Sequence, residues 1–440
     1  MTADQARELC RKWFLQTLEF VRPCLRLREV LRVREGRLEV AGDSYALASF
    51  SEIRVVAVGK AALEMAEATA AILQGEPLRG IVVAPTLPPA PLSGFRYFAG
   101  GHPYPNEQSC RAADAVLEFL TGASSDQLVL FLISGGGSAL LEKPLHPSVS
   151  LDDMRRFHEL LVSSGAAIEE INILRKHLSA VKGGRLAERA APATQVTLYV
   201  SDVPEDVPSA VASGPTMPDE STLEDCRVLA ARYGMMERFP ASVRALLASG
   251  QLPETPKPGH LCFAKSRYHC LLSNGDAVEK LAALARSENV RVAVDSSCDE
   301  WDLQPAAVYL LMRLDQLRRE HPQFPVAVVS GGELSCPVTG AGVGGRNQAF
   351  VLDCVPKIAG QPVVVLSAGT DGIDGNSPAA GAIADGASAE RARSLHLDPD
   401  HYLRQSDSYR FFEKLGDAVI TGPTGTNVRD LRILLAFPAD

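Results

Sequence analysis

The residues best suited to chemistry lie in a glycine-rich loop, residues 134–138, that follows the apolar run 128–133. The apolar run is typical of a strand buried on both faces. Three consecutive glycines permit positive φ and a close approach of the backbone to a ligand, and the amides before a following helix can bind a phosphate or carboxylate. A plain strand-to-helix turn is the alternative. The candidate anion-binding residues are Ser134, Gly135, Gly136, Gly137 and Ser138.

Two cations occur where helices are expected to begin. Lys60 follows the apolar run 54–58 and one glycine, and Arg346 follows a glycine-rich segment at 340–345. The helix dipole disfavours a cation at this end, so a nearby anion would explain each residue. For Lys60, exposure to solvent at a strand edge is the alternative. Asn347, next to Arg346, is a further anion-binding candidate.

Residues 340–345 also satisfy the dinucleotide-binding pattern G-x-G-x-x-G through Gly340, Gly342 and Gly345. Asp371 could then act as the ribose-binding acid, although it lies farther along the chain than the usual spacing of about 20 residues. No clear strand precedes the first glycine, so the nicotinamide interpretation is weak. Direct binding of an anion by Arg346 is favoured.

Carboxylates follow two further predicted strands. Asp202 and Asp206 end the strand predicted within 195–206, and Asp371 and Asp374 punctuate a Gly-rich loop. Such carboxylates can hold Mg²⁺, or they can cap ordinary turns. Asp371 and Asp374 are the candidate metal ligands.

The remaining candidates for phosphate or substrate binding lie in three segments. Residues 175–185 hold four basic residues and a glycine pair, which suits a polyanion, although a solvated face is the usual role of such a run. Residues 325–335 repeat the strand-to-Ser-Gly-Gly pattern, and residues 421–427 are rich in hydroxyls and backbone amides. The candidates are Lys176, Lys182, Gly183, Gly184, Glu333, Thr421, Gly422, Thr424, Gly425, Thr426 and Asn427.

Composition narrows the class of protein. A formal charge of −9 over 440 residues argues against nucleic-acid binding. Nine scattered cysteines without a C-x-x-C pair suggest neither a disulfide framework nor a zinc site, and they fit a reducing compartment. The N-terminal residues lack a signal or transit pattern, and no apolar run is long enough for a membrane span. We therefore expect a cytoplasmic protein with small-molecule ligands.

The elements needed to position these residues alternate between strand and helix. This alternation predicts a doubly wound parallel sheet whose carboxyl-end loops gather Lys60 and residues 134–138 at one edge. A docking helix is expected over residues 5–21, with Asp4 as its N-cap. The proline-rich run 251–260 predicts a boundary between domains at 1–250 and 260–440.

With these residues in view, the chain resembles the class II glycerate kinases, whose C-terminal part is called the MOFRL domain. Nine motifs carry the resemblance, in this order: VGKAALEMA, GHPYPNEQS, LISGGGSALL, NILRKHLSAVKGGRLA, SDVPEDVPSAVASGPTMPDEST, SGGEL, GGRNQ, GTDGIDG and GPTGTNVRDL. The chain departs from the family pattern at Glu205, where a glycine is usual, and at Val343, where a basic residue is common.

The resemblance implies ATP-dependent phosphorylation of D-glycerate, mainly to 2-phosphoglycerate, with Mg²⁺. It implies a cleft between a Rossmann-like N-terminal domain and a smaller C-terminal α/β domain, in a monomer or homodimer. Lys60 and Arg346 correspond to the family's lysine and arginine, and with Asp202 they are the candidate catalytic residues. Two alternatives stay open: a reductase acting on hydroxypyruvate or tartronate semialdehyde, and a non-catalytic protein that binds nucleotide or glycerate.

Overall fold

The computed structural model describes residues 1–204 and 207–438. Glu205 and Asp206, two residues considered above, lie outside the described residues. The chain divides into two compact units, one formed by Met1–Arg22 with Leu272–Asp440 and the other by Pro23–Leu271. The N-terminal helix therefore belongs to the unit that is otherwise C-terminal in sequence.

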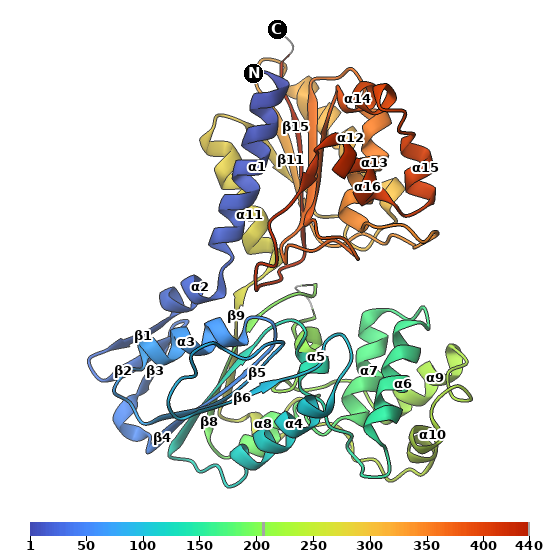
Figure 1. The fold of residues 1–440 in the computed structure, drawn as a ribbon. Coiled ribbons are helices and arrows are strands. Elements are labelled where there is room, and N and C mark those ends of the chain that lie inside the picture. Colours follow the sequence, from blue (N-terminus) through green and yellow to red (C-terminus); the bar gives the residue numbers. More distant parts are fainter. Residues whose placement is uncertain (205–206, 439–440) are drawn as a thin grey trace. The chain divides into compact units, whose positions relative to one another are not determined.

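The unit Pro23–Leu271 is built on a six-stranded sheet (Figure 1). Its order is β6 (Phe95–Ala99), β5 (Leu78–Ala84), β4 (Glu52–Val58), β7 (Gln127–Ile133), β8 (Thr194–Val200) and β9 (Ser266–Leu272). The pairs from β6 to β8 are all parallel. Numbered along the chain, the order is 3-2-1-4-5-6, so the direction of winding reverses between β4 and β7. Ligands of open α/β sheets bind at such a switch point, beyond the carboxyl ends of the strands.

Helices cover this sheet on both faces and extend it at one side (Figure 1). α3 (Ala62–Ile72) lies on one face, and α4 (Glu107–Leu120) and α8 (Arg185–Ala190) lie on the other. A separate helical layer has its own core around Phe157 and Leu174. It consists of α6 (Leu151–Val162), α7 (Ile168–Leu178), α9 (Leu223–Arg232) and α10 (Ala241–Ala248).

The remaining elements of this unit are short. α2 (Pro23–Val30) precedes a three-stranded antiparallel sheet of β1 (Leu31–Arg34), β2 (Arg37–Val40) and β3 (Asp43–Ala46). α5 (Gly137–Leu140) follows β7 directly. Three 3₁₀ turns complete the unit: η1 (Leu47–Ser49), η2 (Pro208–Ser213) and η3 (Leu261–Phe263).

The second unit contains a mixed sheet. Its order is β10 (Arg291–Val294), β11 (Val326–Gly331), β15 (Asp430–Ala436), β12 (Val363–Gly369), β13 (Gly381–Asp385) and β14 (Ala418–Val419). Only β10 and β11 pair in parallel, because the C-terminal strand β15 inserts antiparallel between β11 and β12.

Helices sandwich this sheet (Figure 1). α1 (Ala3–Phe20) and α11 (Asn274–Ser287) cover one face. The other face carries α12 (Leu303–Glu320), α13 (Arg346–Lys357), α14 (Ser388–Ser394), α15 (Pro399–Arg404) and α16 (Ser408–Leu415). The predicted N-terminal helix is present, but its N-cap is Thr2, which forms a capping box with Gln5, and Asp4 lies in the first turn.

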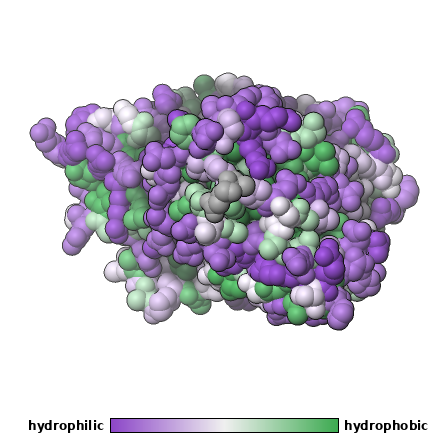
Figure 2. All heavy atoms as spheres, turned by 90° about the horizontal axis from the view of Figure 1, so that it is seen from above, coloured by the Kyte–Doolittle hydropathy of each residue, from purple (hydrophilic) through white to green (hydrophobic). Residues whose placement is uncertain are grey.

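The α/β prediction is confirmed, with a parallel sheet in one unit and a second, mixed sheet in the other. No helix in the described parts of the chain combines the length and the apolar character that crossing a membrane requires. In the view of Figure 2, hydrophilic residues cover most of the face, and hydrophobic residues lie between them in separate small areas.

Candidate active site

The glycine loop and the turn carrying Lys60 are joined by backbone hydrogen bonds. The Ser134 amide donates to the Val58 carbonyl at 2.9 Å, and the Lys60 amide donates to the Gly135 carbonyl at 2.9 Å. The Ser134 hydroxyl accepts from the Ala61 amide at 3.1 Å. The two loops at the switch point of the sheet therefore form one continuous surface, as their predicted positions at adjacent strand ends required.

Three polar side chains surround this loop. A methyl group added to Gly135 would lie 2.2 Å from Asp202 Oδ2, and one added to Gly136 would lie 3.1 Å from His102 Cδ2 and 3.4 Å from Lys60 Cγ. Gly136 has a φ of 82°, which favours glycine on conformational grounds as well. The side chains of Lys60, His102 and Asp202 therefore lie against the backbone of Gly135 and Gly136, where a larger residue would contact them.

The basic segment 175–185, which begins in the last turn of α7, is placed differently. Lys182 is buried, with Nζ 2.6 Å from Glu142 Oε2, and Lys176 is buried with Nζ 3.2 Å from Asp219 Oδ1. The Gly183 and Gly184 amides donate to the carbonyls of Ser213 and Gly214. In the structure the polar groups of this segment contact other parts of the protein, since a buried ammonium needs a carboxylate partner.

In the other unit, Arg346 begins α13 between two carboxylates. Its Nε lies 2.5 Å from Asp430 Oδ2 and its Nη2 lies 2.6 Å from Glu333 Oε1. Burial lowers the pKa of Arg346, but Asp430 and Glu333 outweigh burial, so that the pKa is raised and the guanidinium stays charged. Among residues 1–204 and 207–438, Nη1 has no hydrogen-bond partner. Arg346 can therefore donate to an added anion from a fixed position.

Asp374 caps the same helix from within the protein. Its oxygens accept from the Asn347 amide at 3.1 Å and the Gln348 amide at 2.8 Å, and its side chain is buried. Burial, with the nearby charge of Asp430, raises the pKa of Asp374 to about 7. The Asn347 side chain accepts from the Ser367 hydroxyl at 2.6 Å. The first amides of α13 are thus already bound to a carboxylate.

Asp371 is half-buried, and one of its oxygens accepts from the Ile373 amide at 3.1 Å. The predicted loop 421–427 lies beside it, since the Thr424 amide donates to the Asp371 carbonyl at 3.1 Å. The Thr424 hydroxyl donates to the Thr370 carbonyl at 2.7 Å, and Asn427 Oδ1 accepts from the Arg429 amide at 2.9 Å. Several polar groups of this loop therefore hold its own backbone.

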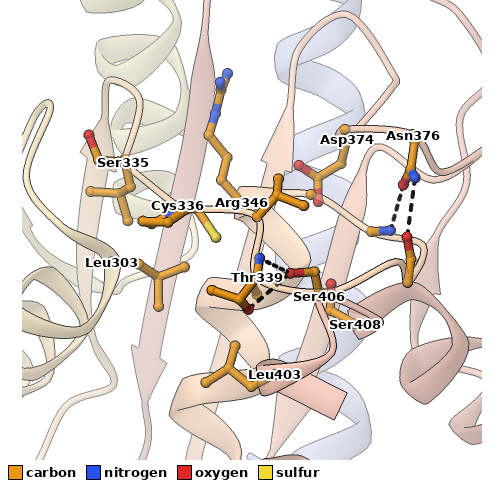
Figure 3. Close-up of a pocket in the computed structure, with 18 of the residues that line it drawn as sticks. Leu303, Ser335, Cys336, Thr339, Arg346, Asp374, Asn376, Leu403, Ser406 and Ser408 are labelled. Carbon is orange, nitrogen blue, oxygen red and sulfur yellow. Dashed lines mark hydrogen bonds between the residues drawn. The ribbon is translucent and has the colours of Figure 1, made fainter. Parts of the chain in front are cut away.

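A pocket of about 1070 Å³ lies within this unit, beside Arg346 (Figure 3). It is bounded by the start of α12, the segment 334–345, the start of α13, the loop after β12 and the start of α16. Arg346, Asp371 and Asp374 contribute to its lining. No described group of three or more histidine, cysteine, aspartate or glutamate side chains is arranged to hold a metal ion.

Family models match residues 9–248, as a domain of unknown function (DUF4147), and residues 326–430, as the MOFRL family. D-glycerate 2-kinase from Thermotoga maritima is 38% identical over 389 residues, which cover 88% of this chain and 91% of that protein. The chain belongs to the glycerate kinase family. This confirms the resemblance seen in the motifs.

The family assignment extends to the fold. The crystal structure of a glycerate kinase from Thermotoga maritima matches with a TM-score of 0.84 and 35% identity, covering 98% of this chain and all of that one. A protein from Agrobacterium vitis named putative hydroxypyruvate reductase is 40% identical over 389 residues, which cover 87% of this chain and 86% of that protein. The glycerate kinase family thus contains relatives with two different activity names.

Sequence reasoning missed Asp430 and Glu142, the partners of Arg346 and Lys182. Asp430 opens a buried strand, and Glu142 follows the predicted glycine loop by four residues. Glu142 follows the apolar residues 139–141, and Asp430 follows Arg429 ahead of a largely apolar segment, so neither acid carries a distinctive signal in the sequence. Which cation each acid would meet depends on tertiary pairing.

Proposed function

We propose that this chain is an ATP-dependent glycerate kinase that converts D-glycerate to 2-phosphoglycerate. The relative from Thermotoga maritima carries the name D-glycerate 2-kinase. The observation that carries the proposal is the meeting of Lys60, His102 and Asp202 at the glycine loop. A cation, open backbone amides and a potential base at one point are what transfer of a phosphoryl group to a hydroxyl requires.

Within this unit, each group has a distinct proposed role. Lys60 would hold the glycerate carboxylate or the transferring phosphoryl group, whose charge is spread over its oxygens. The backbone amides of residues 135–138 would bind the same anionic end of the substrate, whereas the Ser134 amide already donates to the Val58 carbonyl. Asp202 would accept the proton of the 2-hydroxyl as that oxygen attacks phosphorus.

We further propose that Arg346, from the other unit, stabilises the charge that develops on the transferred group. Support comes from the fixed guanidinium, which Asp430 and Glu333 orient. A preorganised donor costs no reorganisation when charge develops in the transition state.

ATP is expected to bind together with Mg²⁺. In this proposal the protein supplies few of the ligands of this ion. Asp374 is buried and both of its oxygens accept backbone amides, whereas Asp371 is half-buried and can reach a bound ion from the surface, so we choose Asp371 from the predicted pair. Mg²⁺ commonly takes one or two carboxylates and fills its remaining positions with phosphate oxygens and water. Asp371 would serve as the one protein carboxylate, and the bound ion would neutralise phosphate charge.

The reductase alternative has one supporting observation, the name of the Agrobacterium vitis relative. Its proposed cofactor motif lacks the strand-turn-helix setting that dinucleotide binding needs. β11 ends at Gly331, and Gly340 and Gly342 instead pack against the Gln405 backbone, where a methyl group would lie 2.4 Å and 2.6 Å from the carbonyl oxygen. The kinase is therefore the favoured function.

The test is incubation of the purified protein with D-glycerate, ATP and Mg²⁺, with enolase added and phosphoenolpyruvate read by its ultraviolet absorbance. Enolase accepts the 2-phosphate and not the 3-isomer, and the readout contains no NADH that a reductase would consume. Lys60→Met and Asp202→Asn should each lower the rate by about 10³-fold or more.

Asp114→Asn, on the exposed surface, is the matched control and should keep the wild-type rate. A Lys60→Met enzyme that keeps near-normal turnover would contradict the proposed roles. Oxidation of NADH by hydroxypyruvate without any phosphoenolpyruvate signal would instead establish the reductase.

A further inference from the structure

We propose that the pocket beside Arg346 is the seat of the nucleoside part of ATP, with the phosphate chain leading along the Arg346 side chain to its guanidinium. This inference rests on the proposed kinase function. It adds a location for the nucleotide within the unit Met1–Arg22 with Leu272–Asp440, separate from the glycine loop of residues 134–138.

The size of the pocket separates the two substrates. Its volume of about 1070 Å³ lies at the upper limit of the range of roughly 300–1,000 Å³ typical of sites for drug-sized ligands. A three-carbon acid would leave most of this space to water and would touch few of the walls. A nucleoside with its phosphates is of the right class to fill it.

The lining is divided in the way a nucleotide requires. Leu303, Leu334, Ala349 and Leu403 contribute apolar surface, with Cys336 among them. In Figure 3, Leu303, Cys336 and Leu403 lie toward one end, and Asp374 and Asn376 lie on another side. The apolar end of the pocket suits the flat faces of a base, and the polar side chains on its other walls suit a ribose and phosphates.

The Arg346 guanidinium points away from Leu303 and Leu403 in the same view (Figure 3). A ligand that rests its base at the apolar end would therefore extend its charged end toward the guanidinium. Nη1 is the guanidinium nitrogen that no described residue engages, so it can donate to a phosphate oxygen without breaking the pairs with Asp430 and Glu333. Phosphates favour such arginine donors.

The wall of the pocket is built before any ligand binds. The Thr339 amide donates to the Ser406 hydroxyl at 3.0 Å (Figure 3). The Thr339 hydroxyl donates to the Arg404 carbonyl at 2.8 Å. The Gly342 amide donates to the Gln405 carbonyl at 3.0 Å. The segment that covers the pocket is thereby tied to the end of α15, and a preformed wall lowers the entropy lost on binding.

Binding of ADP to the full chain tests the proposal without turnover. Isothermal titration would compare the wild type with Cys336→Trp, which places an indole in the pocket, and with Met312→Trp, the matched control, which adds the same indole at an exposed position of this unit outside the pocket. Cys336→Trp should weaken ADP binding by about tenfold or more, while D-glycerate affinity stays within about twofold and Met312→Trp binds ADP like the wild type. Thermal unfolding confirms that each variant is folded.

Photolabelling with 8-azido-ADP gives a second readout that needs no variant. Label on peptides that contain Leu303, Cys336 or Leu403 supports the proposal, and label on residues 134–140 overturns it. Unchanged ADP binding in a folded Cys336→Trp protein also overturns the location while leaving the kinase function intact. A wild-type protein that binds no ADP and forms no 2-phosphoglycerate would overturn both.

Discussion

Replacing Glu142 by glutamine should destabilise the unit Pro23–Leu271 more than any surface charge substitution. Glu142 and Lys182 are 0% and 1% exposed, and their charged atoms lie 2.6 Å apart. The Ser179 hydroxyl donates to Glu142 at 2.6 Å, and His158 Nε2 lies 3.3 Å away. Neutralising the carboxylate leaves a buried ammonium without its counter-ion, which typically costs about 3–5 kcal/mol.

The lowered pKa of Glu142 also indicates how strongly its ion pair stabilises the folded protein. Burial raises this pKa, but Lys182 and His158 outweigh burial and lower it from 4.5 to about 2. The difference corresponds to about 3 kcal/mol. Because the folded pKa lies below the ordinary value, this stability is fully present above pH 4.5 and is lost as the pH falls toward 2.

Calorimetry at pH 7 measures the effect. For a unit of this size, about 3 kcal/mol lowers the Tm by roughly 6–12 °C. Asp114→Asn is the control, because it removes the partner of the neighbouring Lys143 in a pair that is 40% and 58% exposed. An exposed pair contributes about 1 kcal/mol or less, so this Tm should fall by no more than about 4 °C.

Two results would refute the reasoning. One is a Glu142→Gln protein that melts within the range of the Asp114→Asn control. The other is a double variant, Glu142→Leu with Lys182→Met, that is no more stable than Glu142→Gln, since removing both charges also removes the cost of burying either one. Near pH 3 the wild type and Glu142→Gln should approach each other in Tm.

Two further substitutions test the geometry of the candidate site. Gly136→Ala should lower the glycerate kinase rate at least tenfold, because the added methyl group would contact His102 and Lys60. Gly122→Ala is the control, since Gly122 also has a positive φ but has no atom within 4 Å of the added methyl group, so this variant should lose stability alone. The enolase-coupled rate measures the effect on activity, and the Tm measures the effect on stability. Asp430→Asn should lower kcat by about tenfold or more while leaving D-glycerate affinity nearly unchanged, because it loosens the Arg346 guanidinium; an unchanged kcat would contradict the proposed role of Arg346.

The parallel sheet was predictable because its central strands are short apolar runs followed by helix patterns. β4, β7 and β8 coincide with the predicted strands at 54–58, 128–133 and 195–206. β6 was not predicted, since this strand is only partly buried and alternates weakly. The antiparallel strands β1–β3 were likewise not predicted, because pairing between short, exposed segments leaves no strong periodic signal.

The second sheet shows a different limit. β15 is fully buried and central, yet its position between β11 and β12 makes the sheet mixed. Pairing of strands about a hundred residues apart in sequence depends on tertiary packing, which local patterns do not encode. The same insertion brings Asp430 to Arg346, so the missed strand and the missed partner have one cause.

The sequence predicted those parts of the candidate site that depend on where the strands end and on the glycine-rich turns that follow them. The glycine loop and Lys60 were placed correctly at one edge, because parallel strands deliver their following loops to the same edge. The basic run 175–185 shows what residue types alone leave open. Lys176 and Lys182 are suitable phosphate ligands by charge, but the structure buries both beside carboxylates.

Burial with a partner does not by itself decide whether a cation can serve a ligand. Lys182 Nζ bonds Glu142, Ser179 and the Leu141 carbonyl, so its three donors are all used within the protein. Arg346 also pairs with two carboxylates, but a guanidinium carries five donors and Nη1 stays available among the described residues. A lysine held as tightly as Arg346 would have little left for a phosphate. Because a guanidinium has several donors, the protein can hold Arg346 in place while one of its nitrogens still contacts the transferred phosphoryl group.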